Sequence, residues 1–227
     1  TKGVAATRPN WGGRGIWFLW GSAGMVLIGE VFYQAVVLME RSFASMLPNG
    51  SIAAFYYAST ILSVPLFLVV VPLTTILFPR LVELFKQDSR SALGCLAKNS
   101  VLIISLGVGM AATITLFARP LVELLFMRGQ FTMAHAEVTA GILTVTIWAL
   151  PFVSMGRLLR ISCYSLQEYR GPIIAVGIQA LVFLSLGTIL VPRYGSVGLA
   201  VALVCGEAVM MGVMGVVLSY RIRKTAP

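Results

Sequence analysis

Six long apolar segments alternate with short polar ones along the 227 residues of the chain. They cover residues 16–39, 52–78, 100–118, 138–159, 173–191 and 198–220. A helix needs roughly 20 apolar residues to cross a bilayer, and the segments lack the alternation of barrel strands. The pattern predicts an all-α integral membrane protein with six transmembrane helices at 16–220, preceded by a segment at 1–15 and followed by a basic tail at 221–227.

The composition is that of a membrane protein. Hydrophobic residues make up 58% of the chain and charged residues only 11%, whereas a soluble domain has about 25% charged residues. The chain therefore has too few polar side chains to cover a soluble domain of its length. We expect one membrane-embedded unit and no separate soluble domain.

Basic residues are distributed unevenly between the two sides that six spans define. With the N-terminus in the cytoplasm, thirteen of the 17 Lys and Arg residues fall on the cytoplasmic side; those on the outer side are Arg41, Arg119, Arg128 and Arg193. This bias predicts a multi-pass protein of the bacterial inner membrane with both ends of the chain cytoplasmic. Contact with anionic lipid headgroups accounts for the net charge of +9, and the dispersed basic residues argue against a nucleic-acid partner.

Two of the polar segments between spans are mildly amphipathic. They are residues 80–99, on the predicted cytoplasmic side, and residues 119–137, on the outer side. Each is expected to lie as a short helix in the membrane interface. Arg119-Pro120 opens the second of these helices, because proline suits a first helical position.

Ionisable groups inside the apolar segments are the main candidates for function. Placing one at mid-bilayer costs roughly 2.5–3.5 kcal/mol on insertion scales. Glu30 and Glu207 lie inside the first and sixth spans, so we expect them in a water-filled cavity or in an ion contact between helices. Arg157 and Arg160 occupy the last turns of the fourth span, where they face a cavity or extend toward the cytoplasmic headgroups.

Helical geometry sorts the polar residues of the first span onto two faces. At about 100° per residue, Glu30, Gln34 and Arg41 project from one face. Glu40 falls on another face, together with Tyr33. Two interpretations of Glu40 and Arg41 stay open: an interfacial pair, or members of a polar site.

Prolines interrupt two of the spans. Pro65 and Pro72 lie in the second span and Pro151 in the fourth. Each removes a backbone hydrogen bond and bends its helix. Bent helices suit a transporter that alternates its access, so these prolines are candidate hinges; static kinks that serve packing are the alternative.

Other residue patterns favour packing over chemistry. Small residues recur every four positions on the sixth span and predict a close-packing stripe: Gly198, Ala202 and Gly206. The three cysteines lack the spacing of metal ligands, and His135, the single histidine, is expected at the surface. No motif indicates an enzyme, a metal site or a bound cofactor.

Several motifs, in this order and spacing, resemble a known family. They are ERSFASMLPNGSIAAFYYA (40–58), LFPRL (77–81), RGQFT (128–132), CYSLQEYRGP (163–172) and RYGSVGLAVA (193–202). Together they are similar to the MurJ/MviN lipid II flippase family, within the multidrug/oligosaccharidyl-lipid/polysaccharide exporter superfamily. The resemblance covers the chain from about Trp17 and corresponds to the C-terminal six-helix lobe of a two-lobe fold.

The resemblance implies a function and roles for single residues. It implies a lobe that rocks against a second six-helix lobe, in the same chain or in a partner subunit, and passes a lipid-linked oligosaccharide across the membrane. Arg157 and Arg160 would meet the anionic head group. Further substrate contacts would come from Gln34, Ser59 and Thr60. A coupling Na⁺ or H⁺ would bind at one of three acidic residues: Glu30 and Glu207 within the spans, or Glu40 directly after the first span.

The chain also departs from the family pattern. Ser59 and Thr60 stand where many members carry an acidic-basic pair, and in the fifth span residues 182–187 offer only Ser185 as a polar group. These departures favour a divergent flippase of polyprenyl-linked glycans over a strict lipid II flippase. Two further alternatives stay open: a cation-coupled multidrug exporter of the same superfamily, and a membrane assembly partner that does not transport.

Overall fold

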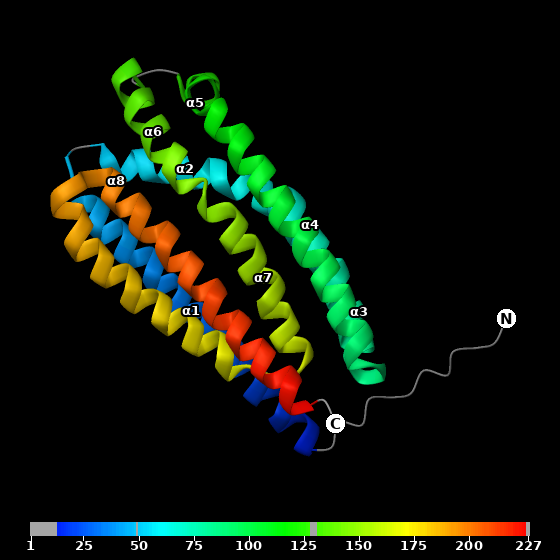
Figure 1. The fold of residues 1–227 in the computed structure, drawn as a ribbon. Coiled ribbons are helices and arrows are strands. Elements are labelled where there is room, and N and C mark those ends of the chain that lie inside the picture. The colour runs from blue at the N-terminus through cyan, green and yellow to red at the C-terminus, as the bar shows by residue number, and fades with distance from the viewer. Residues whose placement is uncertain (1–12, 49, 128–130, 226–227) are drawn as a thin grey trace.

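Long helices form the described part of the chain, which covers residues 13–48, 50–127 and 131–225 of a computed structural model (Figure 1). No strand occurs within those ranges. In chain order the elements are α1 (Gly13–Ser45), α2 (Ser51–Pro65), the π-helix η1 (Leu66–Val70), α3 (Val71–Gln87), α4 (Ser89–Leu116), α5 (Ala118–Phe126), α6 (Met133–Thr146), α7 (Ala149–Ser165) and α8 (Arg170–Thr225).

The helices supply six membrane-crossing segments, as predicted. Four helical stretches of the described chain are long and apolar enough alone: α1, the continuous run Ser51–Gln87, α4 and α8. Helices α6 and α7 form a fifth, bent by 44° at a short break. The sixth comes from α8, whose 56 residues would extend about 84 Å if straight. Its backbone instead leaves the helical conformation at Gly195 (φ 58°, ψ −133°).

The break at Gly195 turns α8 into a hairpin of two antiparallel arms, residues 170–194 and 196–225. Figure 1 shows the yellow arm and the red arm side by side, with the turn at the far end from the C-terminus. A Cβ atom on Gly198 would lie 2.4 Å from the Leu190 carbonyl oxygen, so only glycine allows this approach. Gly206 faces Gln179 on the other arm, and Ala202 is fully buried. These contacts confirm the predicted close-packing stripe.

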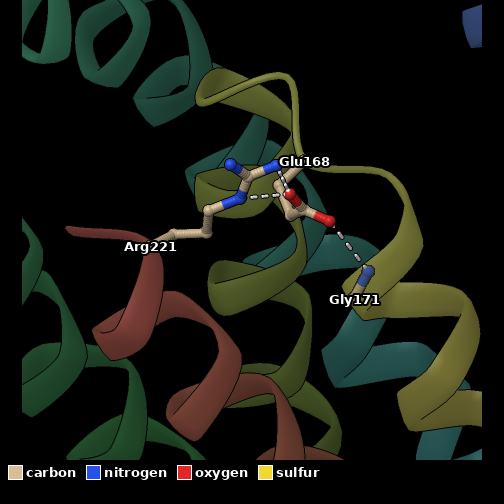
Figure 2. A network of polar contacts seen from close by, with 3 residues as sticks. All are labelled: Glu168, Gly171 and Arg221. Atoms are coloured by element: carbon tan, nitrogen blue, oxygen red, sulfur yellow. Dashed lines mark hydrogen bonds and ion pairs between the residues drawn. The ribbon is translucent and has the colours of Figure 1, made fainter. Parts of the chain in front are cut away.

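A buried acidic residue fastens the hairpin at its opposite end. Glu168 lies in the short loop before α8 and is 7% exposed. Its carboxylate accepts a hydrogen bond from the Gly171 N–H at 3.3 Å and forms an ion pair with Arg221 (Figure 2). Because Gly171 lies in the first turn of the first arm and Arg221 in the last turns of the second, this network holds the two ends of α8 together.

The structure corrects two boundaries. Helix α1 continues to Ser45, past the apolar segment that ends at residue 39, and so includes Glu40 and Arg41, as their assignment to helix faces assumed. Residues 80–99 form no separate interfacial helix, since α3 runs to Gln87 and α4 starts at Ser89, with Asp88 extended between them. Arg, Lys and Glu have high helix propensity, so the helices continue past the ends of the apolar segments. On the other side, α5 confirms the short helix at Arg119-Pro120.

Candidate functional site

A cavity of about 760 Å³ opens between α1, α2, the α6–α7 break and both arms of α8. Its walls are mainly apolar, and its volume falls within the range of roughly 300–1,000 Å³ that is usual for ligand pockets. The polar side chains that line it are Tyr33, Glu40, Arg41, Ser45, Ser51, Tyr56, Tyr57, Ser59, Thr146, Gln179 and Glu207. An apolar chamber with a few convergent polar groups is the best candidate site in the described chain.

The most deeply buried polar contact of this cavity joins the two arms of α8. The Gln179 amide donates from Nε2 to Glu207 Oε1 at 2.7 Å. Gln179 is 2% exposed and Glu207 is 5% exposed. The remaining oxygens, Gln179 Oε1 and Glu207 Oε2, are buried and have no hydrogen-bond partner among the described residues. A buried acceptor without a hydrogen-bond donor costs folding free energy. The pair is therefore either kept for function, or the charge of Glu207 is neutralised.

Helix α1 presents only some of its polar residues to the cavity. Tyr33 and Glu40, seven residues apart, both line it, in agreement with the face predicted for them. Arg41 lines the cavity as well, whereas Glu30 and Gln34 are exposed and lie outside the lining. Glu30, Gln34 and Arg41 are all exposed on α1, which is compatible with the shared face predicted for them, but only Arg41 reaches the cavity.

The two arginines of α7 point to different partners. Arg157 donates from Nε to the Thr74 hydroxyl on α3 at 3.0 Å. Arg160 extends toward α1 and α8: its Cζ lies 5.7 Å from the centre of the Tyr33 ring, and its Nη2 lies 3.8 Å from Met210 Sδ. Its Nε is buried and unpartnered among the described residues. From one helix, Arg157 thus contacts α3 and Arg160 contacts α1 and α8.

Ser59 and Thr60 are also separated, although they are adjacent in sequence. Ser59 lines the cavity. Thr60 is exposed, and its hydroxyl donates to the Tyr56 carbonyl oxygen at 2.8 Å. Ser185 likewise turns away, exposed and bonded to the carbonyl oxygen of Leu181 at 2.8 Å. Of the polar side chains at the positions where the chain departs from the family pattern, only Ser59 reaches the cavity, and Phe183 of the 182–187 stretch contributes an apolar wall.

The prolines lie at the irregular points of the second and fourth spans. Pro65 ends α2 directly before the π-helix, and Pro72 follows in the first turn of α3. Pro151 lies in the first turn of α7, just after the 44° bend. Gly107 of α4 packs on it: a Cβ there would be 2.8 Å from the Pro151 Cα. π-Helical turns and proline breaks loosen the helical ladder at these positions.

A family model described as "Lipid II flippase MurJ" matches residues 3–226. The chain belongs to the lipid II flippase MurJ family. Its relatives include a "Probable lipid II flippase MurJ" of Bdellovibrio bacteriovorus, 31% identical over 83% of this chain and 37% of the relative. A protein of Vibrio cholerae with the same description is 28% identical over 88% of this chain and 39% of the relative. The chain thus spans less than half the length of these curated relatives.

Solved structures show the same fold. A lipid II flippase MurJ in an inward closed conformation superposes with a TM-score of 0.76 at 19% identity, over 87% of this chain and 43% of that one. The MATE transporter VcmN of Vibrio cholerae in its bent form gives a TM-score of 0.84 at 13% identity, over 96% of this chain and 50% of the transporter. Both MurJ and MATE folds therefore contain this six-helix arrangement, in agreement with the predicted superfamily.

The remaining candidate residues of this MurJ-family chain serve local structure. His135 is exposed, and its Nδ1 lies 3.0 Å from the Thr132 hydroxyl in a capping box that starts α6. The three cysteines are free thiols. Within the described ranges, no group of three or more His, Cys, Asp and Glu side chains is arranged to hold a metal ion.

Two polar partners were missed in the sequence. Thr74, which receives Arg157, looks like an ordinary threonine of the second span. Gln179 had a signal: it is the one amide in the fifth apolar segment, and the midpoint between positions 179 and 207 is 193, beside the Pro192–Gly195 turn. Two polar residues placed symmetrically about a hairpin turn are expected to meet across it.

Proposed function

We propose that this chain is one lobe of a flippase that moves a polyprenyl-pyrophosphate-linked glycan of the lipid II type across the bacterial inner membrane. Membership of the MurJ family over residues 3–226 carries this proposal. The chain would work by alternating access against a second six-helix lobe, in the same polypeptide or in a partner subunit. Both ends of the chain would lie in the cytoplasm, as the positive-inside pattern favours.

The substrate's anionic head would be met by side chains that offer positive charge or hydrogen bonds. Arg157 and Arg160 lie on one helix, half-buried and three residues apart. Guanidinium groups suit this task because they bind phosphate oxygens with paired donors. Gln34 and Thr60, exposed on α1 and α2, would take part from the side of the lobe that faces the substrate path, and Ser59 would do so from the cavity.

A coupling cation, Na⁺ or H⁺, would bind at the acidic residues of this lobe. Glu40 and Glu207 line the cavity and are the stronger candidates. Glu30 is exposed on α1 and would act only where a second lobe covers it. Pro65, Pro72 and Pro151 would serve as hinges, because each lies at a break in a span.

The test is translocation of fluorescent lipid II in proteoliposomes that contain the full-length protein. Arg157→Ala and Arg160→Ala should each reduce the rate at least tenfold, since each removes a charge-assisted contact worth about 1.5–3 kcal/mol. Arg119→Ala is the matched control, because Arg119 is an exposed arginine whose ion pair within the described residues is with Glu123 on its own helix. Unchanged rates in both α7 variants would reject the site assignment.

One observation favours a second candidate, a cation-coupled multidrug exporter. The cavity combines mostly apolar and aromatic walls with two carboxylates, Glu40 and Glu207, which suits a lipophilic cation. The two functions separate in one pair of assays on the same proteoliposomes. Export of a cationic dye without lipid II translocation would favour the exporter, and lipid II translocation without dye export would favour the flippase.

A further inference from the structure

The Glu207–Gln179 contact has the features of an ion site and lies well inside the membrane. Glu207 is twelve residues from the turn at Gly195, or about 18 Å along its arm, in a hydrocarbon core of about 30 Å. Both side chains are more than nine-tenths buried and line the cavity wall. Each keeps one buried oxygen without a partner among the described residues.

An ionised Glu207 would be poorly compensated in this position. Its one hydrogen-bond donor within the described chain is the Gln179 amide, and an isolated buried carboxylate costs several kcal/mol. Binding a cation or a proton removes that cost. The number of oxygen ligands decides between these two ions.

A proton fits the surroundings better than a sodium ion. Transporter sodium sites draw several oxygens together, including carbonyls of unwound backbone. Here both arms are helical around positions 179 and 207, so their carbonyl groups are engaged in the helices. The contact itself offers two free side-chain oxygens, and Thr146 Oγ1 is the one other unpartnered buried oxygen of the cavity wall within the described ranges. This sparse set suits a proton on the carboxyl better than a metal cation.

Arg160 is placed to replace the proton as the compensating charge. Its Nη2 lies 3.8 Å from Met210 Sδ, and Met210 is three residues after Glu207, on the same side of the arm. Its Nε is buried without a partner among the described residues, so the guanidinium has an unused donor, and its positive charge acts on the Glu207 carboxylate.

We propose that Glu207 and Gln179 form a proton-binding site, in which Gln179 positions the carboxyl group and Arg160 pairs with the carboxylate after the proton leaves. The inference rests on the proposed function, whose coupling ion it names. The other titratable side chains that line the cavity or lie beside the site are Tyr33, Glu40 and Arg41 of α1, Tyr56 and Tyr57 of α2, and Arg160 of α7. Proton release to the cavity would free Arg160 from its contact with Tyr33 and so couple protonation to the position of α7.

Infrared difference spectroscopy of the full-length protein in nanodiscs tests the site without any lipid substrate. At neutral pH the wild type should show the carbonyl band of a protonated, hydrogen-bonded carboxyl group. Glu207→Gln should lose that band, Gln179→Leu should shift it to the frequency of a less hydrogen-bonded group, and Arg160→Gln should let it persist to higher pH. Glu83→Gln, which alters an exposed carboxylate, should leave the band unchanged.

Added Na⁺ gives the decisive comparison and needs no variant. At fixed pH and constant ionic strength, replacing K⁺ by Na⁺ should leave the band intact; its loss would identify a sodium site and overturn the proposal. Absence of the band in the wild type, or its persistence in Glu207→Gln, would overturn it as well. A failed lipid II translocation assay with the band present would reject the flippase function and leave the proton site standing, so the two failures are distinguishable.

Discussion

The network at the loop before α8 makes a quantitative prediction about stability. Glu168→Ala removes an ion pair with Arg221 and a hydrogen bond from the Gly171 N–H (Figure 2). A hydrogen bond to a charged group contributes about 1.5–3 kcal/mol. Because the Arg221 side chain is 45% exposed, the ion pair itself adds only about 0.2–1 kcal/mol. We expect Glu168→Ala to cost about 2 kcal/mol of unfolding free energy.

Arg221→Ala is the second single variant of a double-mutant cycle with Glu168→Ala. This change leaves the buried carboxylate with the Gly171 amide as its remaining described donor, so it is also destabilising, by about 1–3 kcal/mol. The double variant should cost clearly less than the sum of the two single changes, since the second substitution removes a partner already lost. A coupling of about 1 kcal/mol is expected for residues in direct contact.

Thermal unfolding, followed by the elution of monodisperse protein after heating, measures these differences. For a chain of about this length 1 kcal/mol corresponds to a shift of roughly 2–4 °C, so Glu168→Ala should lower the melting temperature by about 4–8 °C. Arg119→Ala breaks the exposed pair with Glu123 and should change it little. Equal shifts for the Glu168 and Arg119 variants, or strictly additive effects in the cycle, would refute the reasoning.

Three further predictions concern packing, transport and topology. Gly107→Ala should lower the unfolding free energy by about 1–3 kcal/mol, because overpacking against the Pro151 backbone forces a shift. Gly109→Ala is the control in the same melting assay, since a Cβ atom there meets nothing within 4 Å. Equal melting temperatures of the two variants would contradict the contact between Gly107 and Pro151. Thr74→Val removes the acceptor of Arg157 and should slow lipid II translocation several-fold at normal expression, whereas an unchanged rate would show that this contact does not position the arginine. Because the C-terminus is predicted to be cytoplasmic, a fluorescent protein fused to it should fluoresce and an alkaline phosphatase fusion should stay inactive. The opposite results would show that the predicted topology is inverted.

The hydrophobic pattern of the sequence was enough for the six spans but not for the ends of the helices. Hydropathy reports where the chain enters the membrane, whereas helix ends depend on backbone hydrogen bonds and breakers. Glu40 and Arg41 favour helix as well as leucine does, so α1 passes through them to Ser45. The hairpin at Gly195 was correctly separated into two spans because a polar Pro-Arg-Tyr-Gly segment interrupts the apolar run.

The candidate site could be predicted where one helix decides the geometry. The shared face of Tyr33 and Glu40 follows from 100° per residue, and the cavity lining agrees. Contacts between helices could not be obtained in that way, because they depend on the register of one helix against another. Arg157 finds Thr74 across 83 residues, and no periodicity in either helix indicates this pairing.

The positions of the fixed and loose contacts limit how this lobe could move. The hairpin of α8 is held at one end by Glu168 and Arg221, in its middle by Gln179 and Glu207, and by close glycine packing near the turn. The second and fourth spans instead carry a π-helix and a 44° bend. On the proposed hinge role of the prolines, bending is confined to those two spans, while α8 moves as a rigid pair. The hydrogen bond from Arg157 to Thr74 joins the part of the fourth span after its bend to the part of the second span after its π-helix. These two parts would therefore move together, and the arginines would move with them.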